Sequence, residues 1–190
     1  MDADKIQQSI KEASKELFRK YGYHKTSVNE IAKKSRVAKA TIYKYFESKE
    51  VILHEIIMEH LQYSINDLVL KLHPKISREE TIKALILKTS RLSYTVCSEF
   101  IGWDFIRESV NSQDFLKNLS NELEVLLINT FTSLPDFKNV PLERITYLMK
   151  ACKAITFSFA FTSVTVSDVR KNFISFEKEI LPFLIQPVLV

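Results

Sequence analysis

The chain has 190 residues, of which 46% are hydrophobic and 26% are charged, so it is too apolar for a disordered protein and long enough for one or two domains. It holds only two glycines and five prolines, too few turn residues for an all-β protein, and we expect an all-α fold. The net charge of +4 is uneven, because residues 1–50 hold twelve lysines and arginines against seven acidic residues. A basic N-terminal segment is typical of a nucleic-acid-binding unit, although a solvated basic face is the simpler alternative.

The first predicted helix spans about residues 3–21. Apolar residues recur on one of its faces at Ile6, Ile10, Ala13 and Leu17. Gly22 follows as a residue that readily ends a helix.

Residues 27–46 have the layout of a helix-turn-helix. Ser27 and Glu30 have the spacing of a capping box at the start of a short helix, and a turn at residues 35–37 leads into a second short helix. Such a second helix can lie in the major groove of DNA. Its residues without an evident core role are Lys39, Ala40, Thr41, Tyr43, Lys44 and Tyr45.

The rest of the chain predicts further helices. After Ser48 as an N-cap, they span about 49–71, 78–98, 113–133, 141–164 and 168–184, with a short aromatic-rich segment at about 100–110. We expect two domains, a DNA-binding unit at residues 4–64 and a helical ligand-binding and dimerisation domain at residues 65–190.

The last two predicted helices carry an unusual number of large apolar residues, and the first of them has a second apolar or small face. A helix that is apolar on two sides needs partners on both, so we expect a homodimer, with a buried central helix in a monomer as the alternative. The expected interface residues are Ile155, Phe159, Phe173, Phe176, Ile180 and Phe183.

Many aromatic side chains lie on the middle helices and could line a small-molecule pocket, although most such rings belong to a core. The candidates are Tyr94, Phe100, Trp103, Phe131 and Phe157. If the nearby acids Glu99, Asp104 and Glu108 face inward, they favour an aromatic or cationic ligand over an anionic one.

The sequence gives little support for a catalytic site, a metal site or a membrane segment. His54 and Glu55 begin a pattern like that of the zinc proteases, but Met58 stands where the second histidine is needed. Cys97 and Cys152 fall in apolar helical patterns, which favours buried structural thiols. We therefore expect no enzyme, no metal and no cofactor. The polar N-terminus and the short apolar runs predict a cytoplasmic protein with no membrane segment.

The N-terminal block, about residues 4–64, resembles the TetR family of bacterial transcription regulators. The resemblance is carried by Leu17-Phe18, Tyr21-Gly22-Tyr23, Thr26-Ser27, Ile31-Ala32, Val37, Thr41-Ile42-Tyr43, Tyr45-Phe46 and Ser48-Lys49-Glu50. It implies a homodimer that binds a pseudo-palindromic operator in double-stranded DNA. The implied function is that of a repressor released by an unidentified small-molecule inducer. A protein of the same fold that answers to a protein partner remains the alternative.

By position, the resemblance implies that Lys39, Ala40 and Thr41 face the bases. It assigns phosphate contacts to Thr26, Ser27, Tyr43, Tyr45 and Lys49. The chain departs from the family at Arg36, where glycine is usual. Either the arginine adopts the left-handed turn at a cost and is kept for a phosphate or groove contact with DNA, or the turn differs. It also departs at Ala38 and Ala40, which offer DNA only apolar contacts.

Overall fold

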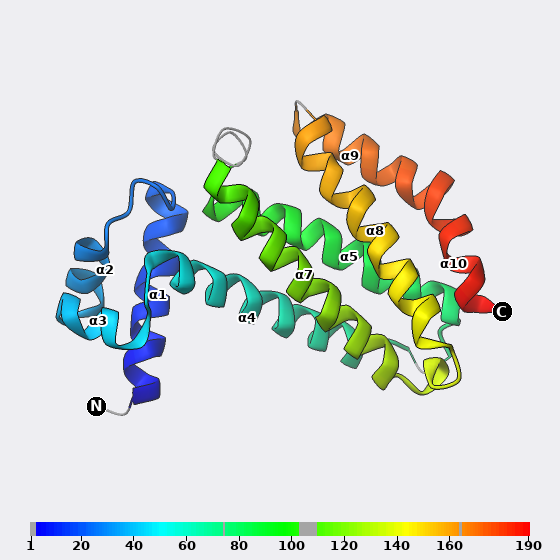
Figure 1. Cartoon of the computed structure of the whole chain (residues 1–190), viewed down its shortest axis with the longest axis horizontal. Coiled ribbons are helices and arrows are strands. Elements are labelled where there is room, and N and C mark those ends of the chain that lie inside the picture. Colours follow the sequence, from blue (N-terminus) through cyan, green and yellow to red (C-terminus); the bar gives the residue numbers. More distant parts are fainter. Residues whose placement is uncertain (1–2, 74, 103–109, 164) are drawn as a thin grey trace. The chain divides into compact units, whose positions relative to one another are not determined.

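The computed structural model describes residues 3–73, 75–102, 110–163 and 165–190, and every regular element within them is a helix, as expected (Figure 1). The chain divides into two compact units. The N-terminal unit comprises Met1–His60 and Thr95–Ser109, and the C-terminal unit comprises Leu61–Tyr94 and Val110–Val190. The long helices α4 (Lys49–Leu70) and α5 (Arg78–Phe100) each contribute residues to both units.

Three helices precede α4 in the N-terminal unit: α1 (Ala3–Tyr21) and the two short helices α2 (Val28–Ser35) and α3 (Lys39–Tyr45). Helix α2 packs against both α1 and α3. Each of the three helices contributes apolar side chains that are almost wholly buried, including Ile10, Phe18, Ile31 and Ile42. The helix-turn-helix is therefore built around a small apolar core, which leaves the other side of α3 exposed.

One residue of the turn between α2 and α3 has the left-handed backbone conformation, although it is not a glycine. Arg36 has φ 58° and ψ 35°, and its backbone N–H donates to the carbonyl of Ala32. It is the one non-glycine residue with positive φ in the part of the chain that the structure describes. The side chain of Arg36 is exposed, so the strain lies in the backbone alone.

Arg36→Gly is expected to raise the free energy of unfolding by about 1 kcal/mol, because glycine adopts the left-handed conformation without a clash at Cβ. Urea unfolding followed by circular dichroism measures this change. Lys33→Gly, in the middle of the preceding helix, is the opposite control and is expected to lower stability by a similar amount. An unchanged or lower stability of Arg36→Gly would show that the arginine side chain compensates for the strain.

The C-terminal unit contains α7 (Val110–Ser133), the short 3₁₀ helix η1 (Pro135–Phe137), α8 (Leu142–Thr162), α9 (Val166–Ser175) and α10 (Leu181–Leu189). Helix α8 contacts α7 as well as α9 and α10, so it is central among these helices (Figure 1). The core of this unit includes Phe131, Phe137, Leu148, Phe159 and Phe176.

A π-helical turn, Phe176–Ile180, joins α9 to α10, and its hydrogen bond runs from the N–H of Leu181 to the carbonyl of Phe176. This turn adds one residue to the repeat of the helix. The buried positions consequently pass from Phe176 to Leu181, five residues on, and then to Ile185 and Val188. A regular helical stripe would have buried Ile180 and Phe183, which the structure leaves 37% and 76% exposed. Pro182 lies two residues after the turn, and a proline ring clashes with the carbonyl four residues back in a regular helix.

Candidate DNA-binding face

The outer side of α3 and its N-cap form an exposed face. Ala38, Lys39, Ala40, Tyr43 and Lys44 are exposed, and Thr41 and Tyr45 are half-buried. Ile42 is buried and faces the core. The structure therefore brings together, on one short surface, the residues that were expected to face DNA from this helix.

The electrostatics of this face favour an anionic partner. The ammonium of Lys39 lies 6.0 Å from the ring centroid of Tyr43, and that of Lys44 lies 5.8 Å from the ring centroid of Tyr45. Helix α3 has no acidic residue of its own. Cations beside phenol groups are suited to contacts with phosphate oxygens.

The other expected phosphate contacts already have partners within the protein. Thr26 is 2% exposed, and its hydroxyl donates to the carbonyl of Gly22 at 2.9 Å. Ser27 and Glu30 form the expected capping box, in which the serine hydroxyl and backbone N–H both donate to the glutamate carboxylate at 2.7 Å. Lys49 donates to two backbone carbonyls. The sequence predicts the capping box, but it does not reveal the contacts of Thr26 and Lys49, which depend on the path of the loop between α1 and α2.

The residues expected at a dimer interface divide into two groups. Phe159, Phe173 and Phe176 are at most 8% exposed, and their rings pack edge to face within one subunit. Their burial corrects the expected role of these three rings, which belong to the core of the subunit and are covered before any partner arrives. Ile180 and Phe183 remain exposed, and Ile155 is half-buried.

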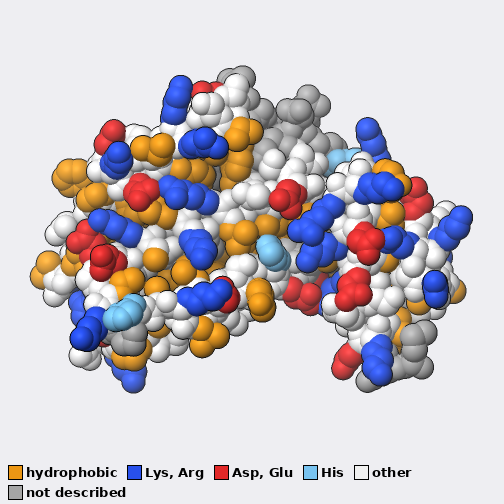
Figure 2. All heavy atoms as spheres, turned by 180° about the vertical axis from the view of Figure 1, so that it is seen from behind, with side chains coloured by type: hydrophobic (Ala, Val, Ile, Leu, Met, Phe, Trp, Pro, Cys, Tyr) orange, Lys and Arg blue, Asp and Glu red, His pale blue; other side chains and the backbone are white. Residues whose placement is uncertain are grey.

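Further large apolar side chains are exposed on the same helices. They are Leu142, Tyr147, Phe157 and Phe161 on α8, and Val166 and Ile174 on α9. On the face drawn in Figure 2, hydrophobic side chains reach the surface at several places over the C-terminal unit. The second apolar face of α8 that the sequence suggested is thus uncovered in a single subunit.

The expected ligand-binding rings that the structure describes lie in different surroundings within their own units. Phe100 lies in the N-terminal unit, below the guanidinium of Arg19. In the C-terminal unit, Phe131 is buried against Phe137, Tyr94 is half-buried against the core, and Phe157 is exposed. These surroundings make Phe131 a core residue. Trp103, together with the acids Asp104 and Glu108, lies outside the described residues. Glu99 forms an ion pair with Arg19.

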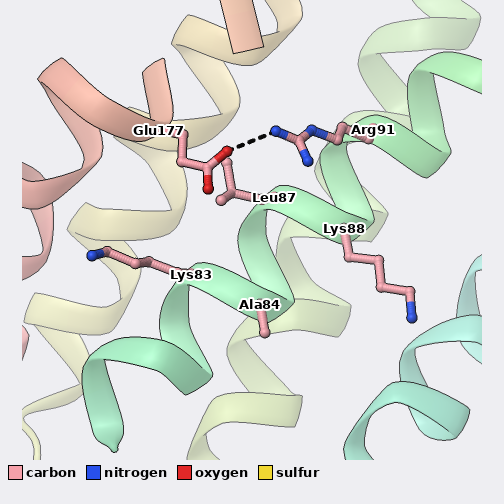
Figure 3. A pocket seen from close by; sticks show the side chains of 6 residues that line it. All are labelled: Lys83, Ala84, Leu87, Lys88, Arg91 and Glu177. Carbon is pink, nitrogen blue, oxygen red and sulfur yellow. Dashed lines mark hydrogen bonds and ion pairs between the residues drawn. The ribbon is translucent and has the colours of Figure 1, made fainter. Parts of the chain in front are cut away.

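An open groove of about 360 Å³ lies along one face of α5, which sequence reasoning did not identify (Figure 3). Its lining residues are Lys83, Ala84, Leu87, Lys88, Arg91 and Glu177. Arg91 and Glu177 form an ion pair at 2.8 Å across the groove, and the side chains of Lys83 and Lys88 extend away from each other. The groove has three basic residues and one acidic residue, so it favours an anionic ligand.

Both cysteines are buried and free, and burial raises the pKa of each thiol to about 12, which keeps them protonated at neutral pH. Within the described ranges, no group of histidine, cysteine and acidic side chains has the arrangement of a metal site. None of the helices described there is long and apolar enough to span a membrane.

Comparison with known proteins identifies the helix-turn-helix. Residues 10–56 match the family model for bacterial regulatory proteins of the tetR family, and this range includes all of α2 and α3. Residues 10–56 thus form a TetR-family segment. The matched range includes the exposed face of α3.

Relatives of known structure support the same fold across the whole chain. A TetR-family repressor, AlkX from Dietzia sp., has a TM-score of 0.64 at 14% identity, with 97% of each chain covered. A TetR-family regulator from Mesorhizobium loti has a TM-score of 0.57 at 17% identity, again with 97% of each chain covered. The regulator FadR from Bacillus subtilis, solved in complex with stearoyl-CoA, has a TM-score of 0.54 at 17% identity and covers 95% of this chain and 98% of its own.

A curated relative has higher sequence identity over a shorter segment. It is the fatty acid metabolism regulator protein of Bacillus subtilis, which is 34% identical over 79 residues. The match spans 42% of this chain and 41% of the length of that relative.

Proposed function

We propose that this TetR-family regulator is a repressor that binds a pseudo-palindromic operator as a homodimer and releases it on binding a long-chain acyl-CoA. The observation that carries the DNA-binding part is the exposed face of α3, where Lys39 and Lys44 accompany Tyr43 and Tyr45 and no acidic residue is present. Major-groove recognition by a second helix, with lysines and hydroxyl groups on phosphates, fits this surface.

The exposed apolar residues of α8, α9 and α10 support the homodimer. A regulator that reads two related half-sites needs two recognition helices, and a two-fold dimer supplies them. Phe183 at 76% exposed and Phe161 at 42% exposed are costly to leave in water, and a second copy would cover them.

The choice of ligand class rests on the relatives. One is named for fatty acid metabolism, and a structural neighbour was solved with stearoyl-CoA. An acyl-CoA combines a long apolar chain with several phosphate charges. The groove beside Lys83, Lys88 and Arg91 is a place where this chain offers positive charge to such a group. This proposal reverses the sequence-based preference for an aromatic or cationic compound.

Sequencing of genomic binding sites, followed by titration of the purified protein onto the recovered operator, tests this function. Stearoyl-CoA is then added below its micelle concentration, with free coenzyme A, free stearate and a mild detergent as controls. We expect saturable release by the thioester alone. Operator binding that no acyl-CoA changes would overturn the ligand proposal and favour control by a protein partner. No preferred binding site would overturn the repressor proposal itself.

A further inference from the structure

The groove along α5 carries its positive charges on one helix. Lys83 and Arg91 are eight residues apart on α5, which corresponds to about 12 Å along the helix axis. Lys88 lies three residues before Arg91, so the two side chains are neighbours on the helix surface. Leu87 also lines the groove and is only 6% exposed. The groove thus presents basic side chains beside an apolar surface that belongs to the core.

The guanidinium of Arg91 is held by two groups of the facing segment, Phe173 on α9 and Glu177 in the π-helical turn. Its central carbon lies 5.7 Å from the centroid of the Phe173 ring, within the range of a cation–π interaction. It also donates a hydrogen bond to the carboxylate of Glu177 at 2.8 Å (Figure 3). Phe173 is 4% exposed, so its ring is a fixed part of the core. Arg91 is therefore oriented at the groove before any ligand arrives.

Two cations of the groove are paired with carboxylates of the protein itself. Glu177 pairs with Arg91, and Glu79, one turn earlier on α5, pairs with Lys83. The side chains of Arg91 and Glu177 are 48% and 42% exposed, and ion pairs exposed to this extent are weakly held. An anionic ligand that approaches Arg91 therefore meets a carboxylate that is already in place but is easily displaced.

A phosphate group is a stronger partner for Arg91 than the carboxylate of Glu177. Both accept paired hydrogen bonds from a guanidinium, but a phosphate monoester carries a charge of about −1.5 to −2 at neutral pH. The exchange leaves the guanidinium on the Phe173 ring, and only the exposed carboxylate has to turn into solvent. A ligand with a single carboxylate has no such advantage over Glu177. The pair therefore favours phosphate-bearing ligands over simple carboxylates.

We propose that Glu177 is an internal competitor in a phosphate-binding site: the phosphates of a coenzyme A head group displace its carboxylate from Arg91, and simple carboxylates do not. The choice of head group rests on the proposed acyl-CoA function. The proposal deepens that function by naming the residue that sets the selectivity of the groove, and Lys88 supplies a second contact to the phosphates.

The first test measures binding of free coenzyme A to the whole protein by calorimetry, without DNA. Glu177→Gln removes the competing charge and keeps the size of the side chain, so it is expected to bind coenzyme A about three- to tenfold more tightly. Asp67→Asn is the matched control, because it removes one carboxylate from an ion pair with Lys71 on α4, outside the groove. We expect a change of less than about twofold there, since salt screens distant charges. No gain in Glu177→Gln, or equal gains in the two variants, would overturn the proposal.

A double-mutant cycle separates displacement from Arg91 from a general effect of the charge on Glu177. Arg91→Met is expected to weaken coenzyme A binding by about tenfold or more, as for loss of a charged hydrogen bond. In that background, Glu177→Gln should no longer raise the affinity, because the shared cation is gone. An undiminished gain there would show that Glu177 acts through its charge alone, and the proposal would fail. Misfolding does not explain a gain in affinity, so the expected result of Glu177→Gln reports on the site.

Smaller probes identify which part of the ligand the groove recognises in the unmodified protein. Pantetheine, which lacks the phosphates of coenzyme A, is expected not to bind, and inorganic phosphate is expected to bind more weakly than coenzyme A. Pantetheine that binds as tightly as coenzyme A would contradict recognition through phosphate. Inorganic phosphate that binds as tightly would contradict the head-group assignment, and so would the absence of any coenzyme A binding.

These outcomes are distinguishable from failure of the proposed function. If stearoyl-CoA leaves the operator bound while the calorimetry gives the expected results, the function fails and the role of Glu177 stands. If stearoyl-CoA releases the operator at the same concentration in the unmodified protein and in Glu177→Gln, the function stands and the role of Glu177 fails.

Discussion

Phe183→Asp is expected to dissociate the dimer and abolish operator binding while leaving the subunit folded. Phe183 is 76% exposed in one subunit, so an aspartate there costs the isolated fold little. In a two-fold dimer the residue occurs twice, and each buried phenylalanine contributes about 1.5–3 kcal/mol. Loss of both, together with two desolvated carboxylates, should raise the dimer dissociation constant by about a hundredfold or more.

Sedimentation velocity and operator titration measure the two effects of Phe183→Asp. Tyr63→Asp is the matched control, because Tyr63 is 71% exposed on α4, which is not one of the proposed interface helices. We expect this control to remain dimeric and to bind DNA. A dimeric, fully active Phe183→Asp protein would place the interface on other residues.

Phe176→Ala is expected to lower the free energy of unfolding by about 3–5 kcal/mol, as for a large ring removed from a core. Phe176 is 0% exposed, and its ring centroid lies 6.3 Å from that of Phe159. A loss of this size is a large part of the total stability of an ordinary domain. Urea unfolding at several protein concentrations provides the measurement.

Protein concentration separates the core role of Phe176 from an interface role. The loss in Phe176→Ala should persist at every concentration, because the missing contacts lie within one subunit. Phe183→Ala should instead lower stability only through weaker dimerisation, an effect that changes with concentration. If Phe176→Ala shows the same concentration dependence as Phe183→Ala, the core assignment of Phe176 is wrong.

The sequence was most informative where structure depends on near neighbours. The capping box of Ser27 and Glu30, the turn at Arg36 and the buried Ile42 all follow from residues a few positions apart, and the structure contains each of them. The exposed side of α3 follows in turn, because burial of Ile42 determines which residues face outward.

Prediction from sequence was weaker where contacts join distant segments. The spacing of Phe173, Phe176, Ile180 and Phe183 fits one helical stripe, yet the π-helical turn divides it into buried and exposed halves. The partners of Lys49 lie more than twenty residues away in the chain, and no local pattern indicates them. Aromatic residues such as Phe100 and Phe131 were grouped by type, although they lie in different units.

The π-helical turn also makes one point in the last helical segment tolerant to a change in length. Removal of the exposed Lys178 would leave Phe176 and Leu181 four residues apart, the ordinary spacing along one face of an α-helix. The buried series through Ile185 and Val188 would then have regular helical spacing, with Pro182 as a break in the backbone hydrogen bonds. The middle of α8 has no extra residue of this kind. A deletion there would rotate all later residues of that helix by about 100°. Natural relatives that differ by a single residue in this region are therefore expected to gain or lose it at the turn, where the same side chains stay buried after the change.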